Sequence, residues 1–316
     1  MDRFHRLLVF VPGNQPVESV VRTADRLARE NNATVTLVDV VGADFGRRMV
    51  RNREAEARVA KEITRAGERR LGRIAELFDW VRPEIVVKAG VDFVEVIRQV
   101  YRGEHDLVLV GSHPRSSQSS RLDPTLTHLL RKCPVPVWVV DTSHADGDVF
   151  VALGPEFDED GKTLNRTLLQ IGSSLAKRTG VGLQIAHVWT VVGEAFVTGR
   201  RMGLARHEME ELADEARETG ESLIRGALND VPAASQATIH LEKGSADQKL
   251  IEMVAREHPS VVVMGTLARR GIAGLIIGNT AEKVLLTIDA SVMAVKPPWF
   301  VSPVPVPADE ALLALD

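Results

Sequence analysis

Cysteine is almost absent from this chain, which carries Cys133 alone among its 316 residues. A disulfide framework within one chain is therefore excluded, and such cysteine usage is typical of a reducing cytosol. No apolar run approaches the ~18 residues that a membrane helix needs, and the first residues do not follow the basic-then-apolar pattern of a signal peptide. We expect a soluble, cytoplasmic protein without a membrane partner.

Neither sign of charge is in large excess, because 39 lysines and arginines face 43 aspartates and glutamates, for a net charge of -4. A broad basic surface for DNA or RNA is therefore not expected. The local cluster of arginines over residues 47–53 runs into Glu54 and Glu56, which is typical of a solvated helix face. The sequence predicts no nucleic-acid partner.

Several motifs of catalysis and metal binding are also missing. The sequence contains no Cys-x2-Cys or His-x3-His pair, no Gly-x-Ser-x-Gly elbow and no Gly-x4-Gly-Lys-Ser/Thr loop. Cys133 precedes Pro134 at the entry to a strand-like run, where a buried small hydrophobe is a better interpretation than a nucleophile. We predict no catalytic residue and no metal site, and therefore not an enzyme.

What the chain does contain is an internal repeat of domain length. Residues 84–90 match residues 238–244, and residues 106–112 match residues 260–266. The glycines within these matches, Gly90 with Gly244 and Gly111 with Gly265, are both 154 residues apart. Equal offsets at two separate places indicate a duplicated domain.

Each half begins with a β-branched run and continues with an amphipathic helical pattern. The matching strand-like runs are 7–11 and 34–41 in the first half, and 149–153 and 182–189 in the second. Strands that alternate with helices predict parallel βαβ units. The predicted fold is α/β, with two tandem doubly wound open sheets of five parallel strands, Rossmann-like and related by a pseudo-two-fold axis.

The predicted division is a first domain over residues 1–143, a second domain over 147–298 and a proline-rich tail over 299–316. The boundary is a polar segment in which Gly147 permits a turn. We expect Trp299 and Phe300 to hold the start of the tail against the domain surface. The final strands of the two halves, near 135–140 and 290–295, are expected to pair within the chain and cover each other's edges.

The most informative segment runs from Gly265 to Glu282, where a strand is followed by a glycine-rich loop and then a helix. The first N–H groups of a helix lack partners and carry partial positive charge, which suits an anion such as phosphate. A structural interpretation remains open beside this one. In it, Asn279 caps the helix and Glu282 completes a box-like pair.

The spacing Gly265-x2-Ala268-x9-Gly278-Asn279 and the Cys-Pro stretch over 128–140 resemble the universal stress protein family, in its tandem E-type form. The resemblance covers about residues 4–298. It implies an adenine nucleotide alpha hydrolase-like fold and a loop that holds the triphosphate of ATP. Carried over position by position, Gly265, Ala268 and Gly278 line the triphosphate, and Asn279 and Thr280 donate to it. Thr266 and Arg269 lie in the same loop and are further candidate binding residues, with a solvated surface arginine as the alternative for Arg269.

The sequence departs from the family pattern at several of these places. Ala268 replaces the second glycine, and Asn279 replaces the usual serine or threonine. ATP-binding members end the first strand with aspartate in a Val-Asp-Gly-Ser pattern, whereas the two halves here read Val-Pro-Gly-Asn from Val11 and Leu-Gly-Pro from Leu153. The first half also lacks the later glycines of the loop, so we expect no ATP there.

The function expected from this resemblance is a non-catalytic regulatory protein of the stress response. It requires no cofactor, and its ligand in the second half is ATP or another small phosphorylated molecule. We also expect its two domains to pair with each other within the chain. Whether two such chains form a homodimer stays open. Two alternatives stay open beside this expected function, a ligand-free protein-interaction scaffold and a slow ATPase.

Overall fold

The computed structural model describes residues 3–13, 17–42, 53–112, 124–141, 146–156, 158–191, 206–266 and 278–305, excepting the side chains of 53–57 and 206. The strands of the first half are β1 (Arg6–Phe10), β2 (Thr34–Gly42), β3 (Glu84–Gly90), β4 (Leu107–Gly111) and β5 (Val137–Val140). Its helices are α1 (Glu18–Asn31), α3 (Arg53–Ala75), α4 (Asp92–Arg102) and α5 (Pro124–Lys132). Strands and helices alternate as the sequence predicts.

The second half repeats this order. Its strands are β6 (Val149–Leu153), β7 (Leu183–Trp189), β8 (Thr238–Lys243), β9 (Val261–Gly265) and β10 (Ser291–Val295). Its helices are α6 (Glu159–Thr179), α8 (Arg206–Asp230), α9 (Ala246–Glu257) and α10 (Asn279–Thr287), with a 3-10 turn η1 (Pro232–Ala234). Within the described ranges, no helix is long and apolar enough to span a bilayer.

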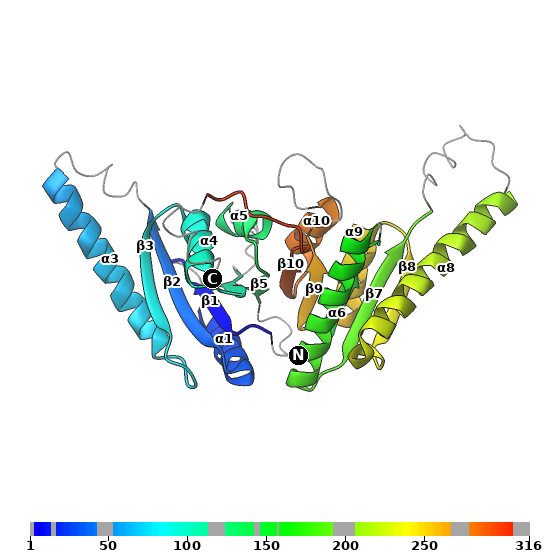
Figure 1. Cartoon of the computed structure of the whole chain (residues 1–316), viewed down its shortest axis with the longest axis horizontal. Coiled ribbons are helices and arrows are strands. Elements are labelled where there is room, and N and C mark those ends of the chain that lie inside the picture. Colours follow the sequence, from blue (N-terminus) through cyan, green and yellow to red (C-terminus); the bar gives the residue numbers. More distant parts are fainter. Residues whose placement is uncertain are drawn as a thin grey trace.

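The strand order is β3-β2-β1-β4-β5-β10-β9-β6-β7-β8, and every neighbouring pair is parallel except β5 with β10. The predicted doubly wound α/β halves are confirmed. The two five-stranded sheets join in the middle of the molecule, where Met293 lies opposite Trp138 and Ala294 opposite Val137. Figure 1 shows β5 and β10 at the centre, with α3 and α8 at the two far ends.

The central strands are buried on both faces, because alternate residues enter two different cores. Leu7 and Val9 of β1 belong to the core that also contains residues of α1, α3, α6 and α8, whereas Leu8 and Phe10 belong to the core that contains residues of α4, α5, α9 and α10. Each core contains residues of both halves, so the hydrophobic layers continue across the β5–β10 junction. This two-sided burial explains the apolar runs that identify the strands in the sequence.

Polar contacts accompany the strand pairing at the junction of the halves. Arg131 of α5 forms a salt bridge with Glu282 of α10, with 2.7 Å between Nη2 and Oε1. The hydroxyl of Ser291 in β10 accepts from the Asp141 amide at 2.9 Å and donates to the Asp141 carbonyl at 3.1 Å. These contacts fix the register of two apolar strands that would otherwise slide.

Lys296 lies buried at the same junction. Its Nζ donates to the carbonyl of Leu130 in the first half and to Oγ1 of Thr266 in the second half, at 2.9 Å for the latter. The ammonium also lies 4.9 Å from the centre of the Phe300 ring. Burial lowers the pKa of Lys296 to about 8, and the nearby Cys133 opposes this in part.

The buried lysine predicts that the protein gains stability in mild alkali. Between about pH 8 and the ordinary lysine pKa of 10.5, the unfolded chain keeps a proton that the folded chain has released, so stability rises with pH. We expect a rise of roughly 1 to 2 kcal/mol in the free energy of unfolding from about pH 8 to 10, relative to Lys296→Met. Urea unfolding of the wild type and of Lys296→Met at each pH measures this rise. Parallel curves of the free energy of unfolding against pH for the two proteins would contradict the prediction.

Candidate functional site

The second half contains the point at which a doubly wound sheet opens for a ligand. From β6 the chain runs outward to β7 and β8, and it then returns to the other side of β6 to form β9 and β10. The crossovers therefore leave the carboxyl ends of β6 and β9 in opposite directions. Ligands of such sheets bind at this switch point.

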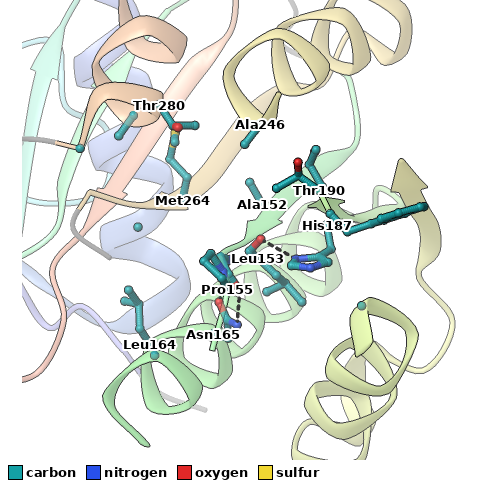
Figure 2. A pocket seen from close by; sticks show the side chains of 18 of the residues that line it. Ala152, Leu153, Pro155, Leu164, Asn165, His187, Thr190, Ala246, Met264 and Thr280 are labelled. Carbon is teal, nitrogen blue, oxygen red and sulfur yellow. Dashed lines mark hydrogen bonds between the residues drawn. The ribbon is translucent and has the colours of Figure 1, made fainter. Parts of the chain in front are cut away.

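A pocket of about 1060 Å³ lies there (Figure 2). Its walls come from the ends of β6, β7 and β9 and from helices α6, α8, α9 and α10, so segments far apart in sequence converge on it. Figure 2 shows Thr280 and Met264 on one side and His187 and Thr190 on the other. The apolar part of the lining includes Leu164, Leu168, Trp189, Leu212, Pro297 and Trp299.

The start of α10 forms one wall of this pocket. Gly278, Asn279 and Thr280 all line it, and the Gly278 amide donates to the Thr266 carbonyl at 2.9 Å. Gly278 is the N-cap residue and has no side chain with which to cap the helix, and among the described residues no side-chain cap is found. The first-turn amides therefore remain available to an external acceptor.

The alternative capping interpretation of this segment is wrong. Asn279 is the first residue of α10 rather than its cap. Glu282, which was expected to complete the box, pairs instead with Arg131 of the first half. The Glu282 carboxylate is attracted to the Arg131 guanidinium across the junction, and this ion pair replaces the hydrogen bond that a capping box makes to the backbone at the start of the helix.

Gly265 and Thr266 lie at the pocket as well, but both have structural reasons to be there. A Cβ atom on Gly265 would approach Cδ2 of Leu164 to 2.8 Å, so the glycine lets α6 pack closely on β9. Thr266 is 1% exposed, and its hydroxyl donates to the Val295 carbonyl at 3.4 Å and accepts from Lys296. The predicted binding residues Ala268 and Arg269 lie outside the described residues.

Asn165 of α6 holds the turn that follows β6. Its side chain is 2% exposed. Oδ1 accepts from the Gly154 amide at 3.0 Å, while Nδ2 donates to the Gly154 carbonyl at 2.9 Å and to Glu156 at 3.0 Å. This double clamp fixes the strand end at which the family pattern has aspartate, and sequence reasoning missed it because the partners are 11 residues apart.

His187 at the end of β7 was also missed by sequence reasoning. Its Nδ1 lies 3.2 Å from the Leu153 carbonyl, which can only accept, so Nδ1 carries the hydrogen and Nε2 is left as an acceptor. Burial lowers the pKa of His187, so the ring stays neutral at pH 7. Gly220 of α8 makes room for the ring, because a Cβ atom there would lie 3.2 Å from Cδ2.

The charge on the described wall of the pocket is acidic. Asp158, Asp160 and Glu215 line it, whereas no lysine or arginine does so in the part of the chain that the structure describes. Asp158 is committed to capping α6, since its carboxylate accepts from the Gly161 amide at 2.9 Å. The carboxylates favour a hydrogen-bond donor in the ligand, whereas the amides at the start of α10 favour an anion.

The corresponding place in the first half is closed by an ion pair. Strand register places Asp39 of β2 where the second half has His187. Arg70 of α3 bonds to Asp39 at 2.8 Å and donates to the carbonyls of Val11 and Pro12 at the end of β1. The guanidinium thus covers the strand end that the second half leaves open to its pocket.

Asp247 ties the helix beside the pocket to α10. Lys283 of α10 donates to its Oδ2 at 2.5 Å, and the Ser245 hydroxyl donates to Oδ1. These two hydrogen bonds lower the pKa of Asp247 to about 2. The link keeps α9 and α10, and hence the start of α10, in a fixed relation.

This link predicts a loss of stability in acid. Because the folded-state pKa lies below the ordinary value of 3.8, the stabilisation is present above about pH 4 and disappears as the pH falls to about 2. We expect Asp247→Asn to lower the free energy of unfolding by about 1 kcal/mol at pH 7, discounted for the exposure of Lys283. Denaturant titrations from pH 7 to 2 measure the difference, with the exposed Asp79→Asn as control. A pH-independent difference would contradict it.

Comparison with known proteins identifies a family that shares this arrangement. The chain matches the universal stress protein family over residues 3–141 and 159–296. It is 27% identical to universal stress protein E of Salmonella typhi, over 96% of this chain and 98% of that protein. It is 26% identical to universal stress protein E of Escherichia coli K12, over 98% and 99%.

Solved structures share the fold. A functionally unknown protein from Pseudomonas aeruginosa PAO1 superposes with a TM-score of 0.66 at 20% identity, covering 93% of each chain. A universal stress protein from Archaeoglobus fulgidus superposes with a TM-score of 0.62 at 16% identity, covering 92% of this chain and 96% of the other. With both of its halves matched, the chain belongs to the universal stress protein family and carries two of the family's domains in tandem.

Proposed function

We propose that this protein is a non-catalytic, cytoplasmic stress-response regulator that binds ATP or a related phosphorylated ligand in its second half. The observation that carries the proposal is the uncapped start of α10 in the wall of a switch-point pocket of about 1060 Å³. The domains would divide as residues 1–143 and 147–298, followed by the tail, and pair through β5 and β10.

In the proposed complex the phosphates lie against Gly278, Asn279 and Thr280. The amides at the start of α10 donate to the phosphate oxygens, and a helix N-terminus favours their negative charge. Arg269, which the sequence places in the loop between β9 and α10, would supply the cation that the described wall lacks. The engaged hydroxyl of Thr266 argues for a structural role of that residue rather than the predicted contact.

The other end of the ligand lies among groups that accept hydrogen bonds. Nε2 of neutral His187 and the carboxylate of Glu215 favour a base or sugar that donates through amino or hydroxyl groups, as adenosine does. Trp189 and Leu212 supply apolar area for the flat base. His187 would therefore take the place of the missing aspartate at the end of the first strand.

The non-catalytic part of the proposal is supported by the engagement of Glu282 and by the types of side chain on the described pocket wall. Glu282, a carboxylate near the loop that a slow ATPase would need as its base, is engaged by Arg131. No serine or cysteine lines the pocket within the described ranges, and Cys133 is buried with its pKa raised to about 12, mainly by burial. Among the same residues, no three histidine, cysteine, aspartate or glutamate side chains lie together as a metal site would need.

Titration calorimetry with ATP, adenosine and tripolyphosphate tests the proposal. We expect saturable heat with ATP at one site per chain, because Arg70 covers the equivalent place in the first half. Adenosine and tripolyphosphate should each bind more weakly than ATP, since each fills one end of the pocket. If none of the three gives heat or shifts the unfolding temperature, ligand binding is rejected and the scaffold alternative stands.

A further inference from the structure

The segment that follows β10 begins at the pocket. Pro297 and Trp299 line it, and a turn closes behind them because the Phe300 amide donates to the Pro297 carbonyl at 3.0 Å. Phe300 is buried, as the sequence predicts for a residue that holds the tail to the surface. The start of this segment is thus part of the wall that a ligand would contact.

The same segment is joined to the base of the loop between β9 and α10. Lys296 donates to Oγ1 of Thr266, and the carbonyl of Thr266 accepts from Gly278. Lys296 also donates to the Leu130 carbonyl of α5, in the first half. One ammonium group therefore contacts the closing residues of the ligand loop and a helix of the other domain.

Beyond Phe300 the segment crosses to the first half, as the red ribbon leaving β10 in Figure 1 shows. Val304 is 6% exposed and belongs to the core that also contains residues of α4 and α5. Ser302 is hydrogen-bonded to the hydroxyl of Tyr101, and the Pro305 carbonyl accepts from Nε of Arg98 at 3.3 Å. Ten residues thus join the pocket of one domain to a helix of the other.

We propose that residues 296–305 act as a strap that couples ligand binding in the second half to the α4 face of the first half. The inference rests on the proposed function and adds its regulation. When the strap is docked, the same segment completes the pocket wall and buries Val304. Coupling between two sites is reciprocal. Any change that weakens docking of the strap at α4 therefore weakens ligand binding, and ligand binding stabilises docking of the strap at α4.

A matched pair of substitutions at the far end of the strap tests this coupling. Val304→Ser removes a buried apolar side chain near the end of the strap, whereas Val301→Ser makes the same chemical change at a residue that is 78% exposed. Neither residue lines the pocket. We expect Val304→Ser to weaken ATP binding by about tenfold, in the range usual for coupling between sites, and Val301→Ser to leave it within twofold.

Tyr101→Phe supplies a second variant that keeps the α4 surface apolar and removes only the hydroxyl that Ser302 contacts. We expect this substitution to weaken ATP binding by about threefold, the effect of losing one hydrogen bond between uncharged groups. Hydrogen exchange adds a readout in the wild type, since saturating ATP should slow exchange of the Val304 amide.

The possible outcomes separate the two proposals. If ATP does not bind the wild-type protein, the proposed function fails and the strap coupling falls with it. If ATP binds the wild type and Val304→Ser equally well, while exchange at residues 300–305 shows that the strap is released, the coupling alone is wrong. Tenfold weaker binding by Val304→Ser but not Val301→Ser supports it.

Discussion

Replacement of Gly278 by valine is expected to weaken ATP binding by at least about a hundredfold. The Gly278 amide already bonds to Thr266, and the following amides at the start of α10 are the proposed phosphate donors. A branched side chain at this place keeps phosphates from reaching that backbone. Loss of two charge-assisted hydrogen bonds, at roughly 1.5 kcal/mol or more each, corresponds to a hundredfold or greater change in affinity.

The substitution should leave the fold intact. A Cβ atom on Gly278 would lie 3.6 Å from the Thr266 carbonyl, an ordinary contact, and its φ of -57° is open to any residue. Gly42→Val is a matched control, because a Cβ atom there would meet nothing within 4 Å and the position lies at the end of β2, in the first half. Equal affinities for the two variants by calorimetry would contradict the proposed phosphate site.

Arg70→Ala is expected to lower the free energy of unfolding by about 3 kcal/mol, the usual cost of removing one partner of a buried ion pair. It leaves the carboxylate of Asp39, whose side chain is 8% exposed, without its cation, and it uncovers the carbonyls of Val11 and Pro12. In a domain of this size the unfolding temperature should fall by roughly 6 to 12 °C.

Arg73→Ala on the same helix is the control, because Arg73 is exposed. Asp39→Asn and the double variant complete a cycle that isolates the pair from the covered carbonyls. Scanning calorimetry would show a first-half transition that moves while ATP binding in the second half is retained. A shift no larger than that of Arg73→Ala would show that the ion pair does not stabilise the first half.

Much of the fold follows from the sequence because burial dictates it. The run predicted at Val149–Leu153 is β6 itself, and the predicted strand over residues 7–11 is β1 shifted by one residue. Pro232 is a helix-stop signal in the sequence, and α8 ends at Asp230, two residues before it. Apolar periodicity and proline are local signals, and two-sided burial of parallel strands makes them strong.

The details of the site depend on contacts between distant segments, which local patterns do not reveal. From the sequence, Glu282 is interpreted as part of a helix cap, but in the fold it pairs with Arg131 of the other domain. Asp39 and Arg70 look like ordinary members of a strand and a charged helix. The prolines predict that the tail is irregular, but only the folded chain shows that Val304 is buried at α4. The predicted contacts of Ala268 and Arg269 stay predictions.

A crystal structure of the full chain grown with a non-hydrolysable ATP analogue tests the central claim most directly. The account predicts phosphate oxygens within hydrogen-bond distance of the amides of Asn279 and Thr280, the base beside His187, and the first half without nucleotide. An analogue bound elsewhere, or a second-half pocket that stays free of analogue at a concentration that saturates the calorimetric signal, would contradict it.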